Sequence, residues 1–142
     1  VSQRLAHGSF DSALLGDVMK KRATGGLFVA EDVATETQRV QAGEIVATGP
    51  IYGRKMWWPD HDAGAFERSV LSEADLSEDS FAKTRKLMLG TRRPIAVSPA
   101  GLHLESAPDG SLNLSFSLPK GTYATVLLRE LMKTSPEPAE SN

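Results

Sequence analysis

The chain has 142 residues, a formal net charge of −2 and no cysteine. A chain of this length can form a single domain with a sizeable apolar core. The lack of cysteine excludes disulfide scaffolds, thiolate zinc sites and cysteine nucleophiles, and no apolar run approaches the roughly 20 residues of a transmembrane helix. Because the overall charge is slightly negative, a nucleic acid would have to be bound by local basic patches.

The first part of the chain is predicted to alternate short helices and strands. The expected segments are a helix end at residues 2–7, strands at 18–22 and 27–30, a short helix at 35–40 and a strand at 44–53. Thr24-Gly25-Gly26, between the first two strands, predicts a hairpin. Gly49-Pro50 predicts a turn that interrupts the last strand.

Two helices are expected in the next part of the chain. Apolar residues at helical spacing predict the first over residues 60–73, with Asp60 as its N-cap. Ser77 is expected to cap the second helix, which carries Phe81, Leu87 and Met88.

After these helices the pattern changes to that of strands. Residues 95–97 form a short apolar run, and residues 102–105 and 112–118 alternate with period two around the turn Asp109-Gly110, which predicts a second hairpin. Six side chains are expected to share its buried face: Leu102, Leu104, Leu112, Leu114, Phe116 and Leu118.

The chain is expected to finish with a helix that starts at Gly121 and has an apolar side. Residues 134–142 are rich in Pro, Glu and Ser, which predicts a disordered tail. The mixture of hairpins and helices indicates an α+β fold.

Charged residues are unevenly distributed along the chain. Residues 60–79 contain seven acids and one base, Arg68, whereas residues 83–93 contain five bases and no acid. Such blocks are typical either of two surfaces with different partners or of a solvated acidic helix packed beside a basic turn.

Arg92 and Arg93, between Gly90 and Pro94, are the sharpest local feature of the basic block. Arginine binds phosphate through paired hydrogen bonds, but it equally well pairs with a carboxylate, so either phosphate contact or an ion pair to the acidic helix is expected. Lys120, at the start of the last helix, offers an anion site or a plain helix N-terminus.

Arg54-Lys55 precede the aromatic run Met56-Trp57-Trp58. Cations beside aromatic rings are typical of single-stranded nucleic-acid sites, where bases stack on the rings. The alternative is an anchor in which one tryptophan ring is buried. The three histidines lack the ligand spacing of a metal site, and Asp60-His61-Asp62 is better explained as a helix start, so no metal site is predicted.

Four motifs together resemble the C-terminal part of the tRNA pseudouridine synthase D (TruD) family. They are Leu15-Gly16-Asp17-Val18 with Thr24-Gly25-Gly26-Leu27-Phe28, Thr48-Gly49-Pro50-Ile51-Tyr52-Gly53, Gly90-Thr91-Arg92-Arg93-Pro94, and Leu118-Pro119-Lys120-Gly121-Thr122-Tyr123-Ala124-Thr125 with Leu128-Arg129-Glu130-Leu131. Their order and spacing match over about residues 2–133.

The resemblance implies a domain arrangement. Residues 1–88 would be the C-terminal part of the family's insertion domain. Residues 89–134 would be the last strand-strand-helix unit of the catalytic domain, and residues 135–142 the disordered tail.

The resemblance also implies a function: part of a cytoplasmic enzyme that isomerises uridine to pseudouridine in RNA, with tRNA as the expected substrate and no metal or organic cofactor. The family's catalytic aspartate lies in a GxKDxxAxT motif and its active-site aromatic residue in an NxFGxQRFG motif, and neither motif occurs in this sequence. No catalytic residue is therefore assigned. Asp11, Asp17 and Asp32 have the sequence contexts of turns or caps.

The expected partners are RNA and the N-terminal half of the same enzyme, with no membrane. The expected RNA contacts are seven basic residues: Lys20, Lys21, Arg54, Lys55, Arg92, Arg93 and Lys120. The alternatives are a non-catalytic RNA-binding or protein-interaction module and a purely structural domain whose arginines pair with the acids of residues 60–79.

Overall fold

A computed structural model describes residues 1–82 and 88–132 of the chain. They divide into two compact units, with the boundary between Ala96 and Val97. Both contain helix and antiparallel sheet, so the predicted α+β class is confirmed. The predicted disordered tail, Leu87, and three of the five bases of residues 83–93 lie outside the described residues.

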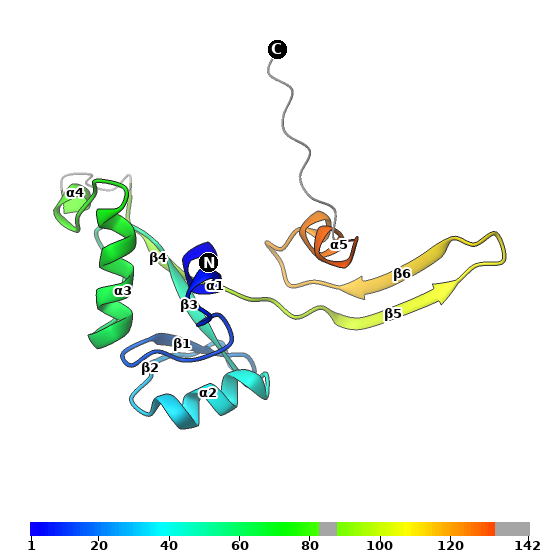
Figure 1. Cartoon of the computed structure of the whole chain (residues 1–142), viewed down its shortest axis with the longest axis horizontal. Coiled ribbons are helices and arrows are strands. Elements are labelled where there is room, and N and C mark those ends of the chain that lie inside the picture. Colours follow the sequence, from blue (N-terminus) through cyan, green and yellow to red (C-terminus); the bar gives the residue numbers. More distant parts are fainter. Residues whose placement is uncertain (83–87, 133–142) are drawn as a thin grey trace, which may run out of the picture. The chain divides into compact units, whose positions relative to one another are not determined.

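The first unit is built on a four-stranded sheet with the strand order β2-β1-β3-β4 (Figure 1). The strands are β1 (Val18–Lys21), β2 (Leu27–Val29), β3 (Ile45–Ile51) and β4 (Thr91–Pro94), and all neighbours are antiparallel. The hairpin predicted around Gly25-Gly26 is confirmed, because Lys20 of β1 pairs with Leu27 of β2.

Two strand predictions are wrong. β3 runs through Gly49-Pro50 without a break. β1 pairs only with residues 45–47 of β3, so the missing N–H of Pro50 interrupts no hydrogen bond between these two strands. Residues 95–97, where a strand was expected, lie outside the described strands: β4 ends at Pro94, and Arg92 and Arg93 are the residues that pair with β3.

One face of the sheet carries the apolar core of the first unit. Met19 and Ala47 are opposite each other on β1 and β3 and are fully buried. Phe28 and Ile95 pack against this cluster, as does Val40 of α2 (Val33–Gln41). Helix α2 confirms the short helix expected at 35–40, and the Asp32 carboxylate caps it by accepting from the N–H groups of Ala34 and Thr35.

On the face of the sheet away from this core, β4 is joined to α3 (His61–Ser72) by hydrogen bonds. Helix α3 confirms the helix expected at 60–73. Asp60 is at the N-cap, but its carboxylate makes no capping hydrogen bond, contrary to the prediction. The N–H of Ala63, which the carboxylate would cap, donates instead to the carbonyl of Leu15 at 3.0 Å. The start of α3 is therefore bound to the turn before β1.

Two short helices complete the first unit: α1 (Ser2–Ala6), which ends before Gly8 as expected, and α4 (Asp79–Ala82). Helix α4 confirms a helix after Ser77, but it is shorter than predicted. Phe81 belongs to it, whereas Met88 does not.

The second unit contains the predicted hairpin, β5 (Ala100–Ser106) and β6 (Leu112–Ser117), and the helix α5 (Ala124–Met132) (Figure 1). Leu104 pairs with Leu114, so the predicted apolar face exists. Its predicted burial is wrong: Leu102, Leu104 and Leu112 are 51–64% exposed. A hairpin of two strands buries an apolar face only when a second layer covers it.

The boundary between the compact units lies after Ala96, whereas the sequence divided the chain after residue 88. The reason is the pairing of β4 with β3, which includes residues 91–94 in the first unit. The assignment of these parts to an insertion domain and a catalytic domain remains a prediction.

Met19 and Leu27 of the first sheet differ in burial, so substituting each should change stability by different amounts. Met19→Ala leaves a cavity in the core and is expected to lower the free energy of unfolding by about 2–5 kcal/mol. Leu27→Ala, at a position that is 41% exposed, should change it by less than about 1 kcal/mol. Urea unfolding followed by tryptophan fluorescence measures both, and equal effects would contradict the described core.

Candidate nucleic-acid interface

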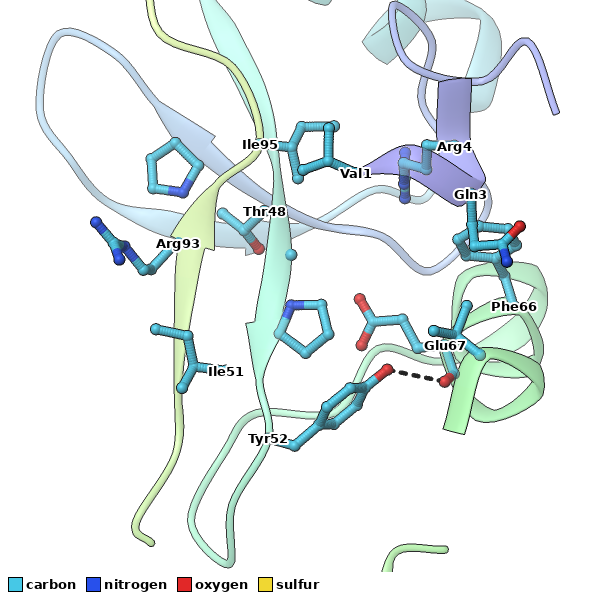
Figure 2. Close-up of a pocket in the computed structure, with 14 residues that line it drawn as sticks. Val1, Gln3, Arg4, Thr48, Ile51, Tyr52, Phe66, Glu67, Arg93 and Ile95 are labelled. Atoms are coloured by element: carbon cyan, nitrogen blue, oxygen red, sulfur yellow. Dashed lines mark hydrogen bonds between the residues drawn. The ribbon is translucent and has the colours of Figure 1, made fainter. Parts of the chain in front are cut away.

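Arg92 and Arg93 lie on opposite faces of β4, because successive residues of a strand alternate between its faces. The Arg92 side chain is 2% exposed, whereas Arg93 is exposed to solvent. Figure 2 shows Arg93 pointing away from Glu67. Arg92 is therefore buried against α3, whereas the side chain of Arg93 remains accessible to solvent.

Every N–H of the Arg92 guanidinium has an acceptor. Two hydrogen bonds of 2.8 and 2.7 Å reach the two carboxylate oxygens of Glu67. Nε donates to the hydroxyl of Thr48 at 3.0 Å, and Nη2 to the Thr48 carbonyl at 2.7 Å. The fifth bond, of 3.3 Å, goes to the carbonyl of Trp57. An arginine has five such donors, so the prediction of Arg92 as a phosphate contact is corrected to an ion pair with the acidic helix α3.

A second buried ion pair joins Arg4 of α1 to Asp17, directly before β1. The other carboxylate oxygen of Asp17 accepts from the N–H of Leu14 at 2.9 Å, and Arg4 also donates to the carbonyl of Ser9 at 3.4 Å. From its sequence context, Asp17 was expected to be a turn residue. Its partner was missed, because no local pattern links an arginine to a carboxylate 13 positions later.

The two pairs interact electrostatically. Burial raises the pKa of the Glu67 carboxyl, while the hydrogen bonds and charge of Arg92 oppose this rise, and Asp17 and Arg4 act more weakly in opposite directions. Tyr52 donates to the backbone carbonyl of Glu67 at 3.0 Å, and burial, followed by the charge of Glu67, raises the pKa of Tyr52 to about 12.

A cavity of about 300 Å³ lies beside these charges in the first unit (Figure 2). Its lining includes Tyr52, Phe66 and Ile95, together with Arg4 and Glu67. Because Arg4 and Glu67 are engaged in the ion pairs, the cavity presents mainly apolar and aromatic surface. Its lining provides a packing surface rather than an acid-base pair.

Arg54 and Lys55 are exposed side chains of a tight turn. The turn closes with a hydrogen bond of 3.1 Å from Met56 to Gly53. The backbone N–H groups of Arg54 and Lys55 donate to the carbonyls of Met88 and Leu89, at 3.1 and 2.7 Å. The backbone of both cations is therefore fixed while their side chains face solvent.

The turn lies where two chain segments cross at glycines. A Cβ on Gly53 would lie 2.3 Å from the nitrogen of Gly90, and a Cβ on Gly90 would lie 2.7 Å from Gly53. Only glycine permits this approach. Both residues belong to motifs that carry the family resemblance.

The predicted basic contacts of the first unit form two groups. Arg54 and Lys55 follow the C-terminal end of β3, near the segment that leads into β4 and Arg93. Lys20 and Lys21 pair with the N-terminal end of β3, and Lys21 lies over the Phe28 ring at 5.6 Å. Lys120 belongs to the second unit and is exposed.

The described part of the chain contains no group of three or more histidine, aspartate or glutamate side chains placed to bind a metal ion. His61 is exposed in the first turn of α3 with a positive φ of 46°. Among residues 1–82 and 88–132, no helix has both the length and the apolar character needed to cross a membrane.

A solved structure has a similar fold. The crystal structure of a Methanosarcina mazei protein described as a putative tRNA pseudouridine synthase D (TruD) superposes with a TM-score of 0.71 and 28% identity, covering 94% of this chain and 34% of that one. The chain therefore has the fold of about one third of that protein.

Sequence relatives point to the same family. A tRNA pseudouridine synthase D of Thermus thermophilus is 47% identical over 133 residues, which are 94% of this chain and 36% of the relative. That of Anaeromyxobacter dehalogenans is 39% identical over 142 residues, 100% of this chain and 40% of the relative.

The model of the family described as tRNA pseudouridine synthase D (TruD) matches residues 1–131. The chain belongs to the tRNA pseudouridine synthase D family, as its motifs indicated. It spans a little over a third of the length of the curated relatives described above and aligns with a C-terminal portion of the family's proteins.

The Arg92–Glu67 pair predicts a pH-dependent double-mutant result. Arg92→Met should lower the free energy of unfolding by about 3–5 kcal/mol at pH 7.5, because Glu67 stays buried without a partner. Adding Glu67→Gln should restore part of the lost free energy of unfolding. The pKa of Glu67 is raised in the folded protein above its ordinary value of 4.5. At low pH Glu67 is protonated, so Arg92→Met should then be nearly as stable as the double variant. As the pH rises and Glu67 loses its proton, the stability of Arg92→Met should fall further below that of the double variant.

Urea unfolding at pH 4.5 and 7.5 measures this result. A double variant no more stable than Arg92→Met at pH 7.5 would show that Glu67 is not held as a buried charge.

The glycine crossing predicts a further difference. Gly53→Ala should lower the free energy of unfolding by about 1–3 kcal/mol, because the added methyl overlaps the backbone of Gly90. Gly26→Ala is the matched control, since its Cβ would meet only the Thr24 hydroxyl at 3.5 Å. Thermal unfolding compares the two, and a Gly53 variant as stable as the Gly26 variant would exclude the close approach.

Proposed function

We propose that the chain forms the C-terminal scaffold and RNA-binding part of a tRNA pseudouridine synthase, an isomerase that converts uridine to pseudouridine in RNA. The supporting observation is that 94–100% of the chain aligns with relatives carrying this name, at 39–47% identity. The substrate follows from the names of the relatives, and the proposed location is the cytoplasm, where tRNA is found.

The proposed catalytic aspartate lies outside these 142 residues, because the family's GxKDxxAxT motif is missing from the sequence. The partner of the chain is then the N-terminal part of the same enzyme. The exposed apolar face of the β5–β6 hairpin offers a surface for such a contact.

The proposed RNA contacts are the basic residues whose side chains face solvent fully or in part: Lys20, Lys21, Arg54, Lys55, Arg93 and Lys120. Arg92 is not one of them. Through Glu67 and Thr48 it positions β4, and β4 in turn presents Arg93.

RNA binding is tested with the 142-residue chain and an unmodified tRNA transcript in a filter-binding titration over a range of salt concentrations. Arg93→Gln should weaken binding and reduce the slope of log K against log salt by about 0.7–0.9, the value for one lost phosphate contact. Arg68→Gln is the matched control, because Arg68 pairs with Glu78 on the acidic side of the unit. Equal effects of both substitutions would contradict the assignment of Arg93.

The proposed location of the catalytic aspartate predicts that the chain alone is inactive. After incubation with tRNA, nuclease digestion and chromatographic separation of nucleosides, no pseudouridine above the background is expected. Pseudouridine formed by the purified chain would show that one of its own residues is catalytic.

A further inference from the structure

The two neighbouring tryptophans have different environments. Trp58 is partly buried: its ring lies 5.6 Å from that of Tyr52, and the guanidinium of Arg68 lies 5.6 Å from the same ring. Trp57 is 45% exposed, and within residues 1–82 and 88–132 its ring has no stacking or cation-π contact. One tryptophan is therefore an anchor, whereas the other presents its ring to solvent.

Trp57 is exposed between buried neighbours. Met56 on one side is 6% exposed, and Pro59 is fully buried. The carbonyl of Trp57 accepts a hydrogen bond from Arg92, which itself is held by Glu67. The backbone is thus fixed on both sides of the ring, so that ordering it on a ligand costs little conformational entropy.

Positive charge lies next to this ring in the chain. Arg54 and Lys55 are exposed in the turn that precedes it, and the hydrogen bonds to Met88 and Leu89 fix that turn. The acidic start of α3 follows Trp57, but Asp60 contacts Gly16 through its backbone N–H and lines a hollow with Ala30 and Glu31. Asp60 therefore lies beside the segment that precedes β1 and the end of β2.

We propose that Trp57 stacks on an unpaired base of bound RNA while Arg54 and Lys55 contact the adjoining phosphates. An exposed aromatic ring beside cations is the arrangement with which proteins bind single-stranded nucleic acid, because every base has a face that stacks. This inference rests on the proposed function, since it names the RNA element that the first unit binds: a single-stranded nucleotide.

The test uses the 142-residue chain with a ten-nucleotide oligouridine and a ten-base-pair RNA duplex. Trp57→Ala should weaken binding of oligouridine about tenfold, the effect of losing one stacked base, and should weaken duplex binding much less. Trp57→Phe should stay within about threefold of the unsubstituted chain, because it keeps an aromatic face. Leu76→Ala is the control, since Leu76 is 43% exposed in the acidic region.

Two further readouts separate stacking from a structural effect. Trp57→Ala should leave the slope of log K against log salt unchanged, because no phosphate contact is lost, whereas Lys55→Gln should reduce it by about 0.7. Oligouridine should also quench tryptophan fluorescence, and Trp57→Ala should abolish that quenching.

The outcomes distinguish this inference from the function on which it rests. If the unsubstituted chain binds neither oligouridine nor tRNA at low salt, both proposals fail. If it binds RNA and Trp57→Ala binds oligouridine as tightly, only the stacking role fails, and the exposed ring is left for a protein contact. An altered salt slope or a lowered urea midpoint in Trp57→Ala also overturns it.

Discussion

The first unit depends on one buried guanidinium. Arg92 comes from the edge strand of the sheet, yet its side chain is almost inaccessible and all five of its donors have acceptors. Those acceptors belong to β3, α3 and the segment before α3. A buried charge of this kind adds little net stability compared with apolar packing, but it penalises any arrangement in which its partners are missing. The pair with Glu67 therefore fixes how β4 sits against β3 and α3.

In the first unit, the motifs that carry the family resemblance have a structural role. Gly16 approaches the carbonyl of Asp60 so closely that a Cβ would lie 2.1 Å from it. The next residue, Asp17, pairs with Arg4, and Gly53 crosses Gly90. These residues join segments that are far apart in the sequence. The solvent-facing cations of the first unit and Trp57 lie on this framework, and hydrogen bonds to Met88 and Leu89 fix the backbone of Arg54 and Lys55.

In the second unit, the sequence pattern and the observed burial differ. Its hairpin has the alternation of a buried sheet, but the leucines at positions 102, 104 and 112 are more than half exposed. The relatives are more than twice as long as this chain, and the proposed enzyme contains a further part that can cover such a face. Alternation in the sequence predicts which side chains share a face. It does not predict whether that face is covered within the same 142 residues.

The sequence by itself determined the local elements: both hairpins with their glycine turns, helices α2, α3 and α5, and the acidic character of α3. These follow from period and turn chemistry over a few residues. Only the tertiary structure decided which arginine of the pair is buried, because a strand places Arg92 and Arg93 on opposite faces and either face could have met α3. It also decided the partners of Arg4 and Asp17, the continuity of β3 through Pro50, and which tryptophan is exposed. Each of these depends on residues distant in the chain, and their contacts form only when the sheet and α3 come together.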